Sequence, residues 1–281
     1  MPQRVENRAG DAAMPAEQGI VLDQLSAGYG KQRIVDSVSL TIPRGKITVL
    51  VGANGSGKST LLTTMARMLA PLGGSVRLDG KSIHHQPTKA VARQLGMLPQ
   101  SPLLPEGLTV FELVSRGRFP WQTLLRQWSP QDEQAVEEAL RLTGTLEFAH
   151  LPVDSLSGGQ RQRCWIAMAL AQQTATILLD EPTTFLDLRY QVEILELLHD
   201  LTRRHGRTVV VVLHDLNFAV NYADMLVFLR QGQLAGVIRE GESCTPEMIK
   251  TVFDVDVQMA LNPLTGKPFF MPFRPREPHA G

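Results

Sequence analysis

The sequence lacks any long apolar run. Its most apolar stretches, such as residues 208–213, are of strand length, whereas a membrane-spanning helix needs roughly 20 apolar residues in a row. Residues 1–16 are polar and lack the apolar segment of a secretory signal. We therefore expect a protein that meets a membrane only through a partner, and we predict disordered tails at residues 1–16 and 274–281.

An excess of charge of either sign is also missing, because Lys plus Arg and Asp plus Glu each number 28 and the formal net charge is zero. This balance gives no bulk attraction to nucleic acid or anionic lipid, so we expect no nucleic-acid partner. Cysteine is scarce: Cys164 and Cys244 stand far apart, without the C-x-x-C spacing of a zinc or redox site. We therefore expect both cysteines to be reduced thiols.

What the sequence does contain is an alternation of strand-like and helix-like segments. Strands are predicted at residues 20–25, 35–42, 47–51, 75–78, 96–99, 176–179 and 208–213. Helices are predicted at 59–69, 88–95, 109–116, 131–143, 158–172, 188–204 and 246–253. The alternation favours an α/β fold with a mostly parallel core sheet, and the first two strands indicate a small antiparallel β layer.

Residues 101–150 differ from their surroundings, because they contain four prolines and two helical patterns but little strand signal. This composition indicates a helical insertion. We therefore predict one domain at residues 17–273 that contains a helical subdomain at about residues 101–160.

A glycine-rich segment follows the apolar strand at residues 47–51 and leads into a helix, which is the context that a phosphate-binding P-loop requires. Glycines let the backbone wrap closely around phosphates, and the helix N-terminus adds positive partial charge. Lys58 is expected to reach the β and γ phosphates, and Ser59 to ligate magnesium. The residues predicted to bind nucleotide here are Gly52, Ala53, Asn54, Gly55, Ser56, Gly57, Lys58, Ser59 and Thr60.

Two further segments become informative only in combination. Asp180 and Glu181 end an apolar strand, where Asp180 suits a magnesium ligand and Glu181 suits the polarisation of an attacking water; alone, a solvated acidic turn is about as good an interpretation. Similarly, Ser157, Gly158, Gly159 and Gln160 precede a helix and by themselves indicate simple N-capping.

The order of these three motifs resembles that of the ATP-binding-cassette (ABC) ATPases, and the resemblance extends from about residue 20 to 272. It implies an ATPase that uses ATP and Mg²⁺ and works as a head-to-tail dimer. In such a dimer, residues 157–160 of one subunit close over the P-loop nucleotide of the other, and Asp187 contacts the partner across the interface. The family often has a small residue where Phe185 stands, which leaves that local contact open.

The same resemblance implies roles for three residues outside these motifs. Tyr29 is similar to the aromatic residue that stacks on adenine, for which its large π-face is suited. Gln100 is similar to the glutamine that touches magnesium and senses the membrane subunit. His214 is similar to the histidine that contacts the γ-phosphate, so that Glu181, His214, Gln100 and Lys58 form the expected catalytic set.

Several segments resemble, more narrowly, the ATPases of ferric-siderophore importers, notably residues 99–102, 105–110, 116–120, 127–129, 183–188 and 214–217. This resemblance implies a peripheral subunit at the cytoplasmic face of the inner membrane. Its partners would be integral permease subunits and, indirectly, a substrate-binding protein. Haem and cobalamin remain alternative cargoes, and a cassette ATPase that acts on nucleic acid or the ribosome remains an alternative of a different class.

Overall fold

The computed structural model describes residues 19–102, 106–123, 127–184 and 186–273. The tails predicted at residues 1–16 and 274–281 lie outside the described residues, as does Phe185. Within the described part of the chain, no helix combines the length and the hydrophobicity needed to cross a bilayer.

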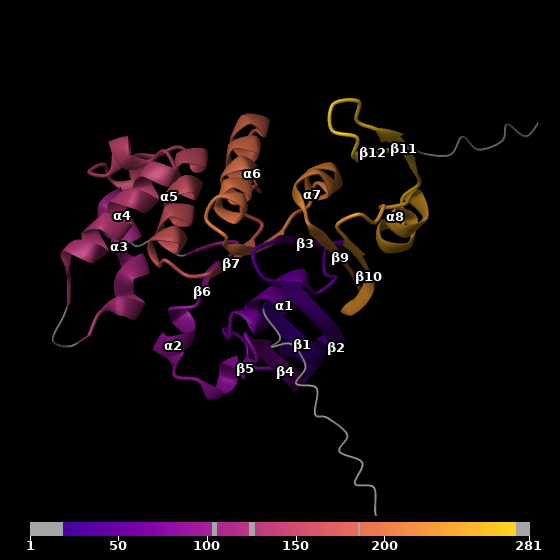
Figure 1. The fold of residues 1–281 in the computed structure, drawn as a ribbon, viewed down its shortest axis with the longest axis horizontal. Helices are drawn as coiled ribbons and strands as arrows, with labels where there is room; N and C mark the ends of the chain where they lie inside the picture. Colours follow the sequence, from indigo (N-terminus) through magenta and orange to yellow (C-terminus); the bar gives the residue numbers. More distant parts are fainter. Residues whose placement is uncertain (1–18, 103–105, 124–126, 185, 274–281) are drawn as a thin grey trace, which may run out of the picture.

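A six-stranded sheet forms the centre of the molecule, with the strand order β10-β9-β3-β8-β7-β6 (Figure 1). All neighbouring strands in it are parallel except β9 and β10, which are antiparallel. Every residue of β3, β7 and β8 is buried, as continuous apolar strands are when helices or a second sheet cover both faces. The strands are β3 (Ile47–Val51), β6 (Leu95–Leu98), β7 (Thr176–Asp180), β8 (Thr208–Val212), β9 (Met225–Arg230) and β10 (Gln233–Arg239).

A smaller antiparallel sheet, with the order β2-β1-β4-β5, lies below one face of the core sheet in Figure 1. Its strands are β1 (Gly19–Tyr29), β2 (Gln32–Pro43), β4 (Gly73–Leu78) and β5 (Lys81–Ser82). Helix α1 (Lys58–Met65) lies between the two sheets, where Leu61 and Leu62 pack with Ile20 of β1 and Leu50 of β3 in one buried cluster. The predicted α/β fold, with its parallel core sheet and small antiparallel layer, is confirmed.

Helices cover the opposite face of the core sheet, where α6 and α7 lie above it in Figure 1 and a helical region extends from one edge. That region contains α3 (Val110–Ser115), α4 (Pro130–Leu142) and α5 (Gly158–Ala171). The remaining helices are α2 (Thr88–Ala92), α6 (Leu188–Arg203), α7 (Leu216–Tyr222) and α8 (Pro246–Phe253), and the hairpin of β11 (Val257–Leu261) and β12 (Pro268–Pro272) follows α8. Helix α5 continues beyond residue 160, the predicted end of the helical subdomain.

Three local differences from the prediction have physical causes. The helix predicted to run to residue 69 ends at Met65, because Arg67 adopts φ +61° and its N–H and that of Met68 bond back to the carbonyls of Thr64 and Thr63. Strand β6 begins at Leu95, where a helix was predicted to end. Helix α7 was not predicted; it is short, and Asp215 caps it by accepting the N–H of Phe218 at 2.9 Å.

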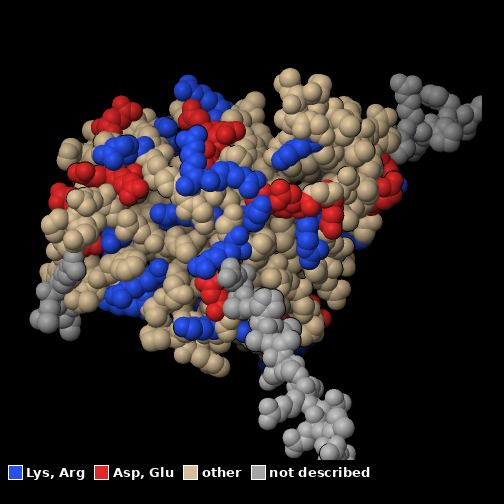
Figure 2. Space-filling view, in the orientation of Figure 1, with Lys and Arg blue, Asp and Glu red and all other residues tan. Residues whose placement is uncertain are grey.

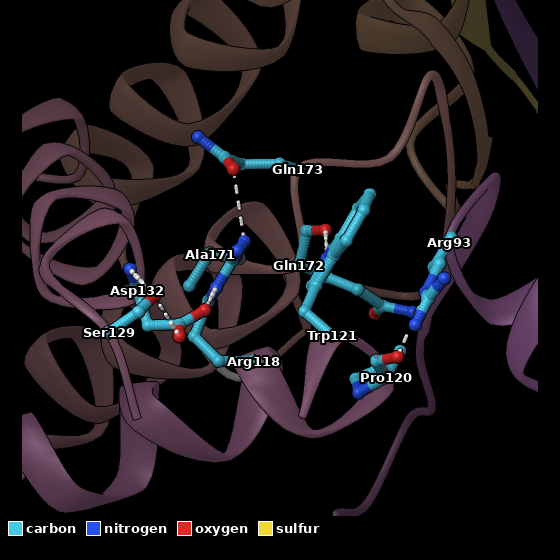
Figure 3. A network of polar contacts seen from close by, with 9 residues as sticks. All are labelled: Arg93, Arg118, Pro120, Trp121, Ser129, Asp132, Ala171, Gln172 and Gln173. Carbon is cyan, nitrogen blue, oxygen red and sulfur yellow. Dashed lines mark hydrogen bonds and ion pairs between the residues drawn. The ribbon is translucent and has the colours of Figure 1, made fainter. Parts of the chain in front are cut away.

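A buried polar joint fastens the helical region together (Figure 3). Arg118, in the 3-10 turn η2 (Arg116–Trp121), forms a buried ion pair with Asp132 of α4, with 2.8 Å between Nε and Oδ1. Its Nη1 donates to the carbonyl of Ala171 at 2.7 Å, and the indole N–H of Trp121 donates to the carbonyl of Gln172 at 2.8 Å. Since the last carbonyls of a helix have no partner within it, these donors fix the C-terminal end of α5.

The same joint reaches the core sheet. The guanidinium carbons of Arg93 and Arg118 lie 5.1 and 5.3 Å from the ring centroid of Trp121, in the range of cation–π attraction. Arg93 also donates to the carbonyl of Pro120 at 3.0 Å. The side-chain amide of Gln172 donates to the carbonyl of Ala92 at 2.5 Å. Because Arg93 lies between α2 and β6, this joint ties α5 to the strand that leads to Gln100.

Candidate nucleotide-binding site

The P-loop (residues 52–59) connects the buried strand β3 to α1, and its backbone requires glycine at two positions. Gly52 has φ +155°, and a Cβ there would lie 2.2 Å from the carbonyl oxygen of Leu229. Gly57 precedes the first residue of α1 with φ +98°, a region that other residues rarely adopt. The loop therefore coils tightly against the core sheet and leads directly into the start of the helix.

Lys58 lies inside this coil rather than at the surface, with only 5% of its area exposed. Its Nζ donates to the carbonyl oxygens of Gly52 at 2.8 Å and Ala53 at 3.0 Å. Burial lowers the pKa of Lys58, while the nearby carboxylates of Glu181 and Asp180 act in the opposite direction. The ammonium group is thus bound by the loop and lies within the electrostatic influence of the two carboxylates at the end of β7.

Ser59 and Asp180 place two oxygen atoms side by side. The Oγ of Ser59 donates to Oδ1 of Asp180 at 3.1 Å, and Asp180 is 4% exposed. Burial raises the pKa of Asp180, an effect that the hydrogen bond from Ser59 opposes and the charge of Glu181 reinforces. A cation beside these oxygens would favour the ionised carboxylate, so the pair fits a magnesium ion.

Glu181 directly follows β7 and is held by side chains that follow the two neighbouring strands, β6 and β8. The Nε2 of Gln100, after β6, donates to Oε2 at 2.6 Å, and the Nε2 of His214, after β8, lies 2.6 Å from Oε1. The Glu181 side chain is only 10% exposed, and its backbone has φ +52°. Because β6, β7 and β8 are adjacent and parallel, the structure brings together three residues that are far apart in the sequence.

Thr184 is a fourth member of this group that sequence reasoning missed. Its Oγ1 donates to Oε2 of Glu181 at 3.3 Å, and its backbone N–H bonds to the carbonyl of Glu181 at 3.2 Å. This is a turn of four residues after a strand, in which the hydroxyl of the fourth residue, a threonine, bonds to the side chain of the first. The signal that could have found it is the spacing of Thr184 from Glu181.

A cavity of about 510 Å³ joins these groups. Tyr29 and Ile34 contribute an apolar wall, and Tyr29 is 57% exposed. Ile34 is a second lining residue that sequence reasoning missed. The lining residues are Tyr29, Ile34, Asn54, Gly55, Ser56, Gly57, Lys58, Ser59, Thr60, Gln100, Glu181, Thr184 and His214.

Of the other predicted residues, Gly52, Ala53 and Asp180 lie in the P-loop and at the end of β7 but are not among the lining residues. Residues 157–160 and Asp187 lie at helix starts away from this lining. Ser157 caps α5 in a reciprocal arrangement: its Oγ accepts the N–H of Gln160 at 3.3 Å, and the side-chain oxygen of Gln160 accepts the N–H of Ser157 at 2.9 Å. Asp187 caps α6 by accepting the N–H of Tyr190 at 3.1 Å. Gly158 and Asp187 are exposed, so these residues are open to a partner rather than directed into the cavity of their own chain.

Comparisons with known proteins agree with this geometry. A family profile described as ABC transporter matches residues 35–184. The achromobactin transport ATP-binding protein CbrD of Dickeya dadantii is 51% identical over 255 residues, which cover 91% of this chain and 95% of that protein. The ferric enterobactin transport ATP-binding protein FepC of Escherichia coli is 46% identical over 250 residues, covering 89% and 92%.

Solved structures are similar over most of the chain. A metal-chelate type ABC transporter in an inward-facing conformation matches with a TM-score of 0.79 at 28% identity, covering 92% of this chain and 98% of that one. The dimeric cassette MJ0796 matches with a TM-score of 0.70 at 29% identity, covering 78% and 98%. The same cassette, in a post-hydrolysis state bound to ADP and Pi, matches equally well.

Proposed function

The chain belongs to the ABC transporter family, as an ATP-binding subunit that hydrolyses ATP, and from this premise we propose that it drives the import of an iron(III)–siderophore complex. The observation that carries the proposal is the level of identity, 46% and 51%, to subunits named for the transport of ferric enterobactin and achromobactin. A cobalamin import ATP-binding protein of Halobacterium salinarum is less similar, with 38% identity over 234 residues. Siderophore is therefore favoured over cobalamin.

In the proposed site, the P-loop holds the phosphates of ATP. Its glycine-dependent coil, the start of α1 and Lys58 supply the positive partial and full charges that phosphates need. The buried Oγ of Ser56 has no hydrogen-bond partner among the described residues, and such an atom costs free energy unless a ligand satisfies it. Tyr29 covers the adenine end of the cavity with its exposed ring.

Ser59, Asp180 and Gln100 would hold Mg²⁺. The first two present oxygens 3.1 Å apart, and the amide nitrogen of Gln100 is engaged by Glu181, which leaves its amide oxygen for a cation. When bound, Mg²⁺ supplies positive charge that offsets the charge on the phosphate oxygens. Glu181 orients and polarises the attacking water, and His214 fixes the position of the Glu181 carboxylate and contacts the γ-phosphate.

Hydrolysis in this proposal needs two copies of the chain, arranged head to tail. The exposed caps at Ser157 and Gly158 and at Asp187 are open to a partner, and the similar cassette MJ0796 is described as dimeric. Residues 157–160 of one subunit close over the nucleotide of the other, and Asp187 contacts the partner. When the dimer closes, each nucleotide is bound by groups from both chains.

The permease would dock on the helical region. A groove of about 390 Å³ there is lined by residues on either side of Gln100, by residues of α3 and α5, and by the residue that follows α3, namely Pro99, Ser101, Pro102, Leu113, Arg116, Trp165 and Met168. Beside it, Phe119 and Trp128 are 66% and 40% exposed. An apolar surface of this kind next to Gln100 suits a helix of a membrane partner, and it would place the subunit at the cytoplasmic face of the inner membrane.

The distribution of charge supports a protein partner over nucleic acid. Lys and Arg are intermixed with Asp and Glu over the face shown in Figure 2, and the formal net charge is zero. Nucleic-acid binding instead calls for a basic stripe or patch. A substrate-binding protein would deliver the cargo to the permease without contacting this chain.

Uptake of ⁵⁵Fe-loaded siderophores by cells that lack this chain tests the proposal. We expect uptake to fail and to be restored by the wild-type chain but not by Lys58→Ala, because the variant loses the ammonium group at the phosphates. The same cells should take up haem and cobalamin normally. Normal siderophore uptake without the chain, combined with loss of haem or cobalamin uptake, would instead identify one of these as the cargo.

A further inference from the structure

The two adjacent glycines at the start of α5 are in different surroundings. Gly158 is exposed, and a Cβ built on it meets nothing within 4 Å. Gly159 is buried, and a Cβ there would lie 2.9 Å from Cδ2 and 3.1 Å from Cγ of Tyr190. Neither glycine has a left-handed φ, so the backbone conformation does not demand glycine. Among the described residues, the three atoms nearest to that Cβ all belong to the ring of Tyr190, so this ring is what excludes a side chain from position 159.

Tyr190 lies in the first turn of α6 and is fixed from two directions. Its backbone N–H donates to Oδ1 of Asp187 at 3.1 Å. Its ring is covered by the guanidinium group of Arg163, whose carbon lies 5.4 Å from the ring centroid. Arg163 follows Gly159 by one helical turn on the same face of α5, so the ring lies against two successive turns of that helix.

Charged neighbours hold this contact in place. Nη1 of Arg163 lies 3.6 Å from Oε2 of Glu193, and Nε of Arg189 lies 2.9 Å from Oε1 of the same carboxylate. Glu193 therefore links α5 to α6 one turn beyond Tyr190. Among the described residues the hydroxyl of Tyr190 has no hydrogen-bond partner, so its contribution to this contact comes from the ring.

These contacts connect two segments that serve different nucleotides in the proposed dimer. Asp187 lies six residues after Glu181, in the loop that Thr184 ties to the subunit's own site through its bonds to Glu181, whereas Ser157 and Gly158 belong to the site of the partner. We infer that Tyr190 is a positioning residue that couples the two ATP sites, and that position 159 is glycine to seat its ring rather than to contact nucleotide. The inference rests on the proposed head-to-tail dimer.

The physical basis is the direct contact between ring and backbone. A shift of Asp187 moves the first turn of α6 and with it the ring of Tyr190, which has only two rotatable side-chain bonds. Because no side chain at position 159 lies between them, the ring transmits that shift to the backbone that carries Ser157 and Gly158. A state of one site thereby changes the geometry offered to the other, which is the requirement for coupling between sites.

ATP hydrolysis by the chain assembled with its permease tests this coupling, with Gly159→Ala, Tyr190→Ala and the double variant. Gly159→Ala should lower kcat by about tenfold because its Cβ overlaps the ring. Tyr190→Ala should lower the Hill coefficient for ATP from near 2 toward 1, with little change in the affinity for a fluorescent ATP analogue. Removing the ring should relieve the overlap, so the double variant should recover to the level of Tyr190→Ala.

The conservative variant and a matched tyrosine separate coupling from simple packing. Tyr190→Phe keeps the ring and should retain the Hill coefficient. Tyr222→Ala removes a half-buried tyrosine that contacts α6 through Glu196, and should lower the thermal stability without changing the Hill coefficient. A double variant no more active than Gly159→Ala, or an unchanged Hill coefficient in Tyr190→Ala, would overturn the inference. If the wild-type chain did not dimerise when ATP is added, this result would instead contradict the proposed function.

Discussion

The Nε2 atom of His214 lies 2.6 Å from the Oε1 atom of Glu181, although the two residues end different strands and are separated by the whole of α6. Gln100 donates to the other carboxylate oxygen. The carboxylate is therefore oriented from both sides. Contacts of this kind make the position of the proposed general base depend on two neighbouring loops.

Glu181→Gln should retain ATP binding and nearly abolish turnover. The amide is close to the carboxylate in size but polarises water poorly, so we expect kcat to fall by about 10²–10⁴-fold. Equilibrium binding of a fluorescent ATP analogue and phosphate release measure the two effects separately. Turnover at the wild-type rate would remove Glu181 from the role of base.

Thr184→Ala should have a smaller effect on the same step. The bond from Thr184 to Glu181 is long, at 3.3 Å, and the carboxylate keeps its two shorter contacts. We expect kcat to fall by about 2- to 10-fold, the factor that corresponds to one ordinary hydrogen bond. Thr184→Ser keeps the hydroxyl and serves as the matched control; equal losses in both variants would mean that the hydroxyl has no part in positioning Glu181.

The sequence predicted the fold class because strands such as 47–51 and 208–213 are short, continuous apolar runs bounded by turn residues. It did not predict α7, whose seven residues are too few for a helical period to stand out. Nor did it place the end of α1, because Arg67 takes the left-handed conformation that glycine usually signals. Local patterns thus sufficed for long elements and failed at short ones.

The candidate site likewise has one part that the sequence predicted and another that it did not. The P-loop is a local pattern, and its residues 54–59 line the cavity together. In contrast, the contacts of Gln100 and His214 with Glu181 depend on strand order and on side-chain direction, which no local pattern encodes. The contact between Gly159 and Tyr190 could not be predicted from the sequence either, because it depends on how α5 packs against α6.

Both cysteines should be unreactive in the folded protein. Burial raises the pKa of Cys164 to about 11 and that of Cys244 to about 12, and the thiolate is the reactive form. At pH 8, Ellman's reagent should therefore modify neither thiol until denaturant is added, and should then report two. Rapid release of thionitrobenzoate from the native protein would show that at least one of these sites opens readily.

Breaking the buried ion pair between Arg118 and Asp132 should destabilise the protein strongly. Both side chains are less than a tenth exposed, so Asp132→Asn leaves the Arg118 charge without its counter-ion. We expect a loss of about 3–5 kcal/mol in the free energy of unfolding, measured by urea titration. The control is Arg204→Ala, which removes an exposed ion pair with Asp200; the Arg204 side chain is 75% exposed and that of Asp200 43%. The urea midpoint of this variant should barely differ from that of the wild type. Equal effects of the two substitutions would mean that burial does not determine the contribution of these pairs.

The same ion pair should make stability depend on pH in the acid range. Although burial acts to raise the pKa of Asp132, hydrogen bonds from Ser129 and Arg118 and the charge of Arg118 hold it below its ordinary value of 3.8. The unfolded chain then binds the proton more tightly than the folded one, so the contribution of Asp132 is fully present above about pH 4 and is lost as the pH falls through its folded pKa. Urea titrations of the wild type and Asp132→Asn should therefore differ by a constant amount from pH 7 to about pH 5 and converge below pH 4. If the difference instead grew as the pH fell, the pKa of Asp132 would be raised on folding, and the ion pair would not be what stabilises this joint.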